Sequence, residues 1–162
     1  MDLDPELQEQ LGAAMQAFLS NEDETRDGAY QFLHDFKSKE PLLFVKYLIF
    51  YLSNDQMPPQ SRALASIFLY QLLHKRTPDQ QRQFLASWKK LDDLETRDNL
   101  RLAAYNGVVS GDKELQLQCS NLLGLFYSIE NCLGMPESSA FTFSDSLNEL
   151  LNIANESPDV EL

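Results

Sequence analysis

The residues that could carry acid–base, metal or nucleophilic chemistry are few in this chain of 162 residues. The two histidines, His34 and His74, fall on different expected helices, and the two cysteines, Cys119 and Cys132, are 13 residues apart. A metal site would require all four side chains to converge, which this spacing does not favour. Cys119 lies on an apolar stripe, where a buried core thiol is the more common role. We therefore expect no metal site.

Glycine and the acidic residues add no catalytic pattern. The six glycines match neither the Walker spacing nor the dinucleotide-binding spacing, so we expect no loop that cradles phosphates. The acidic residues gather at the starts of expected helices, as Asp92 and Asp112 do, where the helix dipole favours negative charge. We predict that the chain is not an enzyme and has no cofactor of its own. A small acidic enzyme is the alternative from a different functional class.

Acidic residues outnumber basic ones 25 to 13, which gives a net charge of −12. Because nucleic-acid binding usually needs a basic face, direct binding to nucleic acids is not expected. Two cysteines are too few for a disulfide scaffold, and no apolar run is long enough to span a membrane. The first residues also lack the pattern of a signal peptide. These features predict a soluble intracellular protein without membrane insertion.

The charge is unevenly spread along the chain. Residues 1–40 carry a net charge of −7 and residues 92–162 carry −10, whereas residues 41–91 carry +5. One interpretation is ordinary variation on solvated helix faces. The other is a locally basic surface that contacts a partner with an acidic patch.

Apolar residues recur at steps of three and four along most of the chain, which is the period of an amphipathic helix. The first stripe runs from Leu3 to Phe18, and the clearest runs from Leu115 to Leu133. The segment from Leu42 to Leu52 is apolar nearly all round, which predicts a buried helix. A further helix is expected from about Gln60 to Arg76, and a last one from Ser144 to about Asn155. No strand is expected, so the sequence predicts seven or eight helices in an all-α fold.

Several residues predict where these helices begin. Asn21 with Glu24, and Asp92 with Glu95, have the spacing of a capping box. Pro41 and Pro78 suit the first helical position, and Thr77 suits the N-cap before Pro78. The cluster His74-Lys75-Arg76 is expected to close the helix from Gln60, where cations complement the dipole, and it could contact a partner as well. Trp88 is expected to be a buried anchor for a short connecting helix rather than an exposed contact.

The helices fall into pairs. The second helices of successive pairs are expected to begin near Glu22, Gln60 and Asp112, at spacings of 38 and 52 residues. Helical-pair repeats of the HEAT type run to about 40–47 residues, and the longer interval contains the extra short helix. Periodicity alone also allows a closed helical bundle.

Local sequence favours the solenoid. The stretch from Arg62 to Gln71 resembles the second helix of repeat two in the N-terminal region of the importin-beta (karyopherin-beta) family. Trp88, Leu91 and the run Arg97-Asp98-Asn99-Leu100 resemble that family's tryptophan, leucine and arginine-x-x-aliphatic pattern, with one extra residue between Trp88 and Arg97. The helix after Asp112 corresponds to the second helix of repeat three. The chain departs from the pattern at Tyr70-Gln71, where the family often has Lys-Asn.

The resemblance covers about residues 3–155. It implies an all-α HEAT-repeat solenoid of paired antiparallel helices with about three and a half repeats, which would form the start of a much longer receptor. The implied parts of this single segment, 1–162, are repeat one (3–40), repeat two (41–76), a connecting helix (77–91), repeat three (92–133) and the start of repeat four (144–155).

The resemblance also implies a function. In this family the second helices form a concave face that binds the GTPase Ran in its GTP form, during transport between cytoplasm and nucleus through the nuclear envelope. Cargo, importin-alpha-type adaptors and nucleoporins would bind later repeats. The expected Ran contacts are polar or amphipathic positions beside the apolar stripes of the second helices: Arg26, Tyr30, Tyr70, Gln71, Lys75, Arg76, Gln118 and Asn121.

Two related interpretations remain open at this stage. Another HEAT-repeat scaffold or adaptor, acting in translation or trafficking, would share the fold without binding Ran. An exportin or transportin relative would bind Ran but carry different cargo.

Overall fold

The computed structural model describes residues 4–89, 94–133, 148 and 152. Within these residues the chain forms α-helices and no strands, as the sequence predicts. The helices are α1 (Pro5–Phe18), α2 (Asp23–Lys39), α3 (Pro41–Ser53), α4 (Pro59–Leu73), α5 (Pro78–Lys89), α6 (Leu94–Val108) and α7 (Lys113–Leu133).

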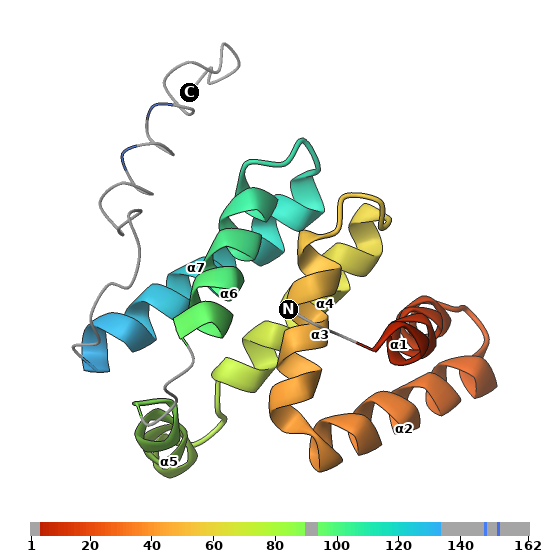
Figure 1. The fold of residues 1–162 in the computed structure, drawn as a ribbon, viewed down its shortest axis with the longest axis horizontal. Helices are drawn as coiled ribbons and strands as arrows, with labels where there is room; N and C mark the ends of the chain where they lie inside the picture. Colours follow the sequence, from red (N-terminus) through yellow and green to blue (C-terminus); the bar gives the residue numbers. More distant parts are fainter. Residues whose placement is uncertain (1–3, 90–93, 134–147, 149–151, 153–162) are drawn as a thin grey trace.

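The long helices form three helical hairpins, α1–α2, α3–α4 and α6–α7, and the short helix α5 connects the second hairpin to the third (Figure 1). Helix α3 packs against α6, and α4 packs against α7, so equivalent helices of these two hairpins stack on one another. In the first hairpin, α1 packs against both α3 and α4. This stacking of hairpins is the solenoid arrangement rather than a closed bundle.

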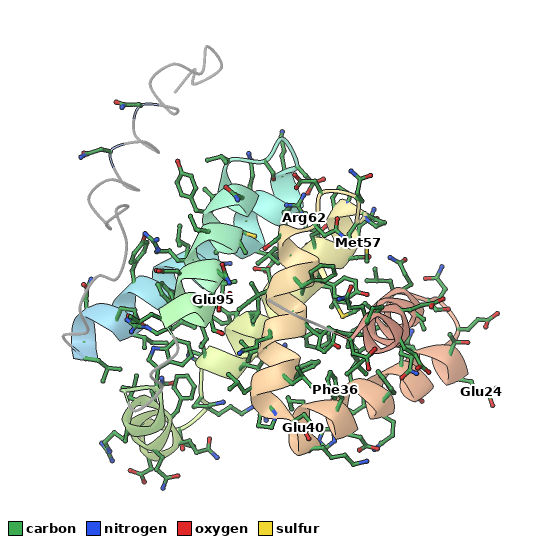
Figure 2. The ribbon with its side chains drawn as sticks, viewed as in Figure 1. Glu24, Phe36, Glu40, Met57, Arg62 and Glu95 are labelled. Carbon is green, nitrogen blue, oxygen red and sulfur yellow. The ribbon has the colours of Figure 1, made fainter. Side chains whose placement is uncertain are left out.

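Helix α3 lies at the centre of the core. Phe44, Tyr47, Leu48, Ile49, Tyr51 and Leu52 are all buried, because α3 is covered by α1, α2, α4 and α6. This confirms the buried helix that the sequence predicts for this segment. Figure 2 shows Phe36 of α2 lying beside α3, and its ring packs edge-on against those of Phe44 and Tyr47 at 5.6 and 5.9 Å between centroids.

Two glycines allow close contacts between helices. A methyl group added at Gly12 of α1 would overlap the hydroxyl of Tyr51. That hydroxyl donates a hydrogen bond to the carbonyl oxygen of Gln8. A methyl group added at Gly107 of α6 would overlap the sulfur of Cys119, which is fully buried as predicted. Packing therefore favours glycine most strongly at position 107, whereas at position 12 the end of the Tyr51 side chain would have to shift.

Some helix boundaries follow the sequence and others do not. Pro41 and Pro78 stand at first helical positions, and the Thr77 hydroxyl accepts a hydrogen bond from the Gln80 N–H at 3.3 Å. The capping box at Asn21 and Glu24 is wrong. Helix α2 begins at Asp23, one residue later than that box requires, with Glu22 at the N-cap and no side-chain cap. The Ser20 hydroxyl accepts the Glu22 N–H at 3.1 Å.

The predicted end of the fourth helix is also wrong. Helix α4 ends at Leu73, and His74 has an extended backbone with φ −91° and ψ 120°. The Gln81 side chain from α5 accepts the Lys75 N–H at 2.8 Å and donates to the Leu73 carbonyl at 3.4 Å, so this turn is stabilised by a partner outside the helix. Lys75 and Arg76 therefore lie in the connection rather than closing the helix.

Several predictions concern positions outside the described residues. They are the first residue of the initial stripe, Leu3, the family-like Leu91, the capping residue Asp92, and the expected start of repeat four at 144–155, of which only residues 148 and 152 are described. Of the helices that the structure describes, none combines the length and apolar character needed to span a membrane.

Candidate partner-binding surface

The predicted contact residues lie on the second helix of each hairpin or just after it. Arg26 and Tyr30 are on α2, Tyr70 and Gln71 are on α4, and Gln118 and Asn121 are on α7, whereas Lys75 and Arg76 follow α4. The structure brings some of these residues together in two grooves that meet at the α4–α5 connection.

The first groove, here called the α2–α4 groove, has a volume of about 220 Å³. Its floor is apolar, because Leu33, Phe44 and Phe68 lie at the junction of α2, α3 and α4. Its other lining residues are mostly polar, and none of the residues that line it carries a carboxylate. Three of the predicted residues lie in it, and the full lining is Tyr30, Leu33, His34, Lys37, Phe44, Phe68, Gln71, Leu72 and Arg76.

The second groove, here called the α4–α7 groove, is larger, at about 420 Å³. It lies between the end of α4, the start of α5 and the last two turns of α7. Cations line one side and apolar or small polar side chains line the other, again without a carboxylate. The lining is His74, Lys75, Arg76, Thr77, Pro78, Gln81, Leu85, Leu125, Ser128, Ile129 and Cys132. Because Arg76 lines both grooves, the α4–α5 connection forms the ridge between them.

The Lys75 side chain is held in place by α5. Its ammonium nitrogen lies 5.0 Å from the centre of the Phe84 ring, a cation–π contact. Burial lowers the pKa of the Lys75 ammonium below its usual range, and the positive charge of Lys37 lowers this pKa further. Since Lys37 lines the other groove, the cations of the two grooves act on one another as parts of one basic surface.

Other predicted residues lie outside the two groove linings. Arg26 forms an ion pair with Asp23 and donates to the Ser20 carbonyl at 3.4 Å, so it is engaged at the start of α2. The Tyr70 ring stacks on that of His74, with 5.5 Å between centroids and 12° between planes. On α7, Gln118 is partly buried and Asn121 is exposed, and both precede the first groove-lining residue of that helix.

The structure adds residues that the sequence-based prediction missed. His34 and Lys37 share the α2–α4 groove with Tyr30. They follow Tyr30 by four and seven residues, so helical periodicity could have placed them on the same face. Gln81 and Ser128 of the α4–α7 groove gave no such signal, because α5 and α7 meet there through tertiary packing.

Trp88 has the anchoring role that the sequence predicts. Its side chain is only 7% exposed, and its indole N–H donates to the Glu130 carboxylate at 2.7 Å. The same carboxylate is paired with the buried guanidinium of Arg97. These contacts fix α5 and α6 to α7, and so hold the α4–α5 connection where the two grooves meet.

The arrangement is suited to recognition. Among the described residues, no group of three or more His, Cys, Asp or Glu side chains could hold a metal ion. Burial raises the pKa of the Cys119 thiol, although Ser66 and Arg62 oppose that rise, which favours the inert neutral form. Apolar floors with cationic rims can bind a partner through shape and charge.

No protein-family model and no curated protein matches the chain. Solved structures do match. A crystal structure of importin beta in an ammonium sulfate condition is 21% identical with a TM-score of 0.65, over 75% of this chain and 14% of that one. A structure in which Kap95p binding induces the switch loops of RanGDP to adopt the GTP-bound conformation is 16% identical with a TM-score of 0.76, over 94% of this chain and 17% of that one.

These likenesses establish the fold as a HEAT-repeat solenoid like that of importin beta. The chain spans no more than 17% of the length of these two structures.

Proposed function

We propose that this chain is the Ran-binding N-terminal segment of an importin-beta-like nuclear transport receptor. The observation that carries this proposal is the match to Kap95p over 94% of the chain, in a structure that concerns the binding of Kap95p to Ran. Receptor and GTPase would associate in the cytoplasm and nucleus. Cargo, importin-alpha-type adaptors and nucleoporins would bind repeats that lie outside this segment.

The two grooves support the proposal because they lie on the second helices, where the resemblance places the Ran contacts. Tyr30, Gln71 and Arg76 would contact Ran from the α2–α4 groove, and Lys75 from the α4–α7 groove. Gln118 and Asn121 would extend this surface along α7. Tyr70 and Arg26 would contact Ran at the edges of this surface.

Binding would need no covalent chemistry and no cofactor of the chain itself. The nucleotide would act through Ran, because the γ-phosphate of GTP orders the switch loops of a GTPase. The chain would then recognise those ordered loops by shape and charge. This mechanism predicts a preference for Ran-GTP over Ran-GDP.

A pull-down with purified chain tests the proposal. The immobilised chain is exposed to Ran loaded with GDP or with a non-hydrolysable GTP analogue, and a thermal melt verifies that it is folded. We expect clear retention of the GTP-analogue form and little of the GDP form. Equal retention of both forms, or none by a folded chain, would contradict the proposal and favour another HEAT-repeat scaffold.

A further inference from the structure

The α4–α5 connection presents a hydroxyl group directly before a proline. The prolines of the chain follow a serine or threonine at only two places, Thr77-Pro78 and Ser157-Pro158. Thr77 and Pro78 are both exposed, and so are the preceding His74 and Arg76. The first of the two sites is therefore open to solvent within the described fold.

The connection between α4 and α5 is not helical. His74 leaves α4 in an extended conformation, Arg76 and Thr77 form a bend, and α5 begins at Pro78. The Thr77 oxygen accepts one long hydrogen bond, from the Gln80 N–H at 3.3 Å, and its own proton remains available. The hydroxyl can thus be reached and used as a nucleophile.

We propose that Thr77 is phosphorylated by a proline-directed protein kinase and that the phosphate weakens partner binding at the α4–α7 groove. The second half of this inference rests on the proposed function.

In the phosphoryl transfer, the Thr77 oxygen attacks the γ-phosphorus of ATP bound with Mg²⁺ in the kinase. The bond from that phosphorus to the bridging oxygen breaks, ADP leaves with the electron pair, and the hydroxyl proton passes to the catalytic base of the kinase.

The charge change falls on the basic surface. A phosphothreonine carries about −1.5 to −2 at neutral pH and has three strong acceptor oxygens. Thr77 lines the α4–α7 groove together with Lys75 and Arg76, so the new charge nearly offsets these two cations. A partner with an acidic patch would lose that attraction and meet repulsion instead. The phosphate also follows α4 and precedes the first turn of α5, where negative charge is tolerated, so the fold is retained.

Phosphorylation itself can be tested on the full chain. The chain is incubated with an active mitogen-activated protein kinase and Mg-ATP, and phosphate is located by mass spectrometry. We expect modification at Thr77 that both Thr77→Ala and Pro78→Ala abolish. Phosphorylation of Ser157, which also precedes a proline, and of a synthetic peptide of residues 72–84 shows whether the kinase is active. A kinase that modifies the peptide but not the folded chain, or neither, would overturn the proposed site.

The consequence for the groove has a readout that does not involve Ran. Cys132 lines the α4–α7 groove and is exposed, whereas Cys119 is fully buried, so alkylation by the neutral reagent N-ethylmaleimide reports on Cys132. Because the thiolate is the form that reacts, the negative charge of a phosphate in the same groove disfavours it and should slow this reaction severalfold at low salt. An unchanged rate would mean that the phosphate does not act on the groove.

A Ran-GTP titration completes the test. Phosphorylation should weaken binding by roughly tenfold or more, since it adds repulsion to the lost attraction. Equal affinity of both forms would overturn the regulatory half and leave the site itself standing. If the unmodified, folded chain fails to bind Ran-GTP, the proposed function fails, and the mass-spectrometric and Cys132 results still decide the modification and its effect on the groove.

Discussion

Arg97 of α6 and Glu130 of α7 form an ion pair that is almost completely removed from water, with side chains 4% and 12% exposed. The Arg97 Nε donates to one carboxylate oxygen at 3.1 Å, and an Nη donates to the other. The Trp88 indole N–H donates to the first of these oxygens at 2.7 Å. One carboxylate therefore joins three helices, and the tryptophan and arginine that carry part of the sequence resemblance have a structural role.

Removing that carboxylate should strongly destabilise the fold. Glu130→Ala leaves the Arg97 charge buried without its partner, which typically costs about 3–5 kcal/mol. Urea unfolding followed by Trp88 fluorescence measures the loss. The double variant Arg97→Met with Glu130→Leu should recover part of it, because both charges of the pair are removed and only the Trp88 N–H loses its acceptor. Glu114→Ala, an exposed change in the first turn of α7, is the matched control. A loss for Glu130→Ala as small as that control would contradict the buried pair.

The helical glycines should respond to alanine in a fixed order. An added methyl at Gly107 would lie 2.9 Å from the Cys119 Cβ, which cannot move without its helix, so Gly107→Ala should destabilise by about 1–3 kcal/mol. Gly12→Ala should lose less, because it meets mainly the far end of the Tyr51 ring. Gly28 has open space around it, so Gly28→Ala should stabilise by about 0.5–1 kcal/mol. Thermal melts of the three variants give the order, and a neutral Gly107→Ala would contradict the packing.

How far the sequence predicts this fold depends on whether a feature is local. The α7 stripe from Leu115 to Ile129 is buried as predicted, because its period depends on one helix only. The end of α4 was misplaced, because the Gln81 side chain from the next helix holds the turn. The start of α2 was also misplaced, by one residue, because the N-cap is Glu22 rather than Asn21.

In the candidate surface, too, the sequence predicts what one helix determines and misses what depends on packing between helices. Helical periodicity places Tyr30 and Gln71 on suitable faces of their own helices, and it could have placed Lys37 on the face of Tyr30. Their meeting in one groove depends on how α2 packs beside α3 and α4, which no pattern within a single helix encodes. Arg62 lies in the stretch that resembles the importin-beta family, but it takes no part in the candidate surface. It is buried, and its Nε donates to the Leu52 carbonyl at 2.9 Å, near the α3–α4 turn in Figure 2, so its role is structural.

Alkaline pH should weaken the fold through buried neutral acids. Burial raises the pKa values of Tyr47, Tyr51 and the Cys119 thiol. Each group ionises more readily in the unfolded chain, so the stability that it contributes is complete below its unfolded pKa and is lost as pH rises above it. For the thiol this loss begins near pH 8.5, and for the tyrosines near pH 10. The lowered pKa of Lys75 acts in the opposite direction.

Urea unfolding at pH 7, 9 and 10.5 measures this dependence. The free energy of unfolding should fall with rising pH, and Cys119→Ala should flatten the fall between pH 8.5 and 10. Cys132→Ala removes an exposed thiol instead and should leave the slope unchanged. A slope that is the same in both variants and the wild type would rule out Cys119 as its source.

The proposed function predicts a specific role for the cations at the ridge between the grooves. Changing Lys75 and Arg76 together to glutamate should weaken binding of Ran-GTP by roughly tenfold or more, through repulsion as well as lost attraction. Because both residues lie beyond the end of α4, the free energy of unfolding should fall only by the loss of the Lys75–Phe84 cation–π contact, about 0.5–1 kcal/mol.

Arg82→Glu with Lys113→Glu is the matched control, since it changes the net charge equally at exposed positions outside both grooves. Binding titrations at two salt concentrations, with thermal melts alongside, measure both effects. If the control weakened binding as much at low salt, total charge alone would explain the result. If neither variant weakened it, the binding face would lie elsewhere on the solenoid.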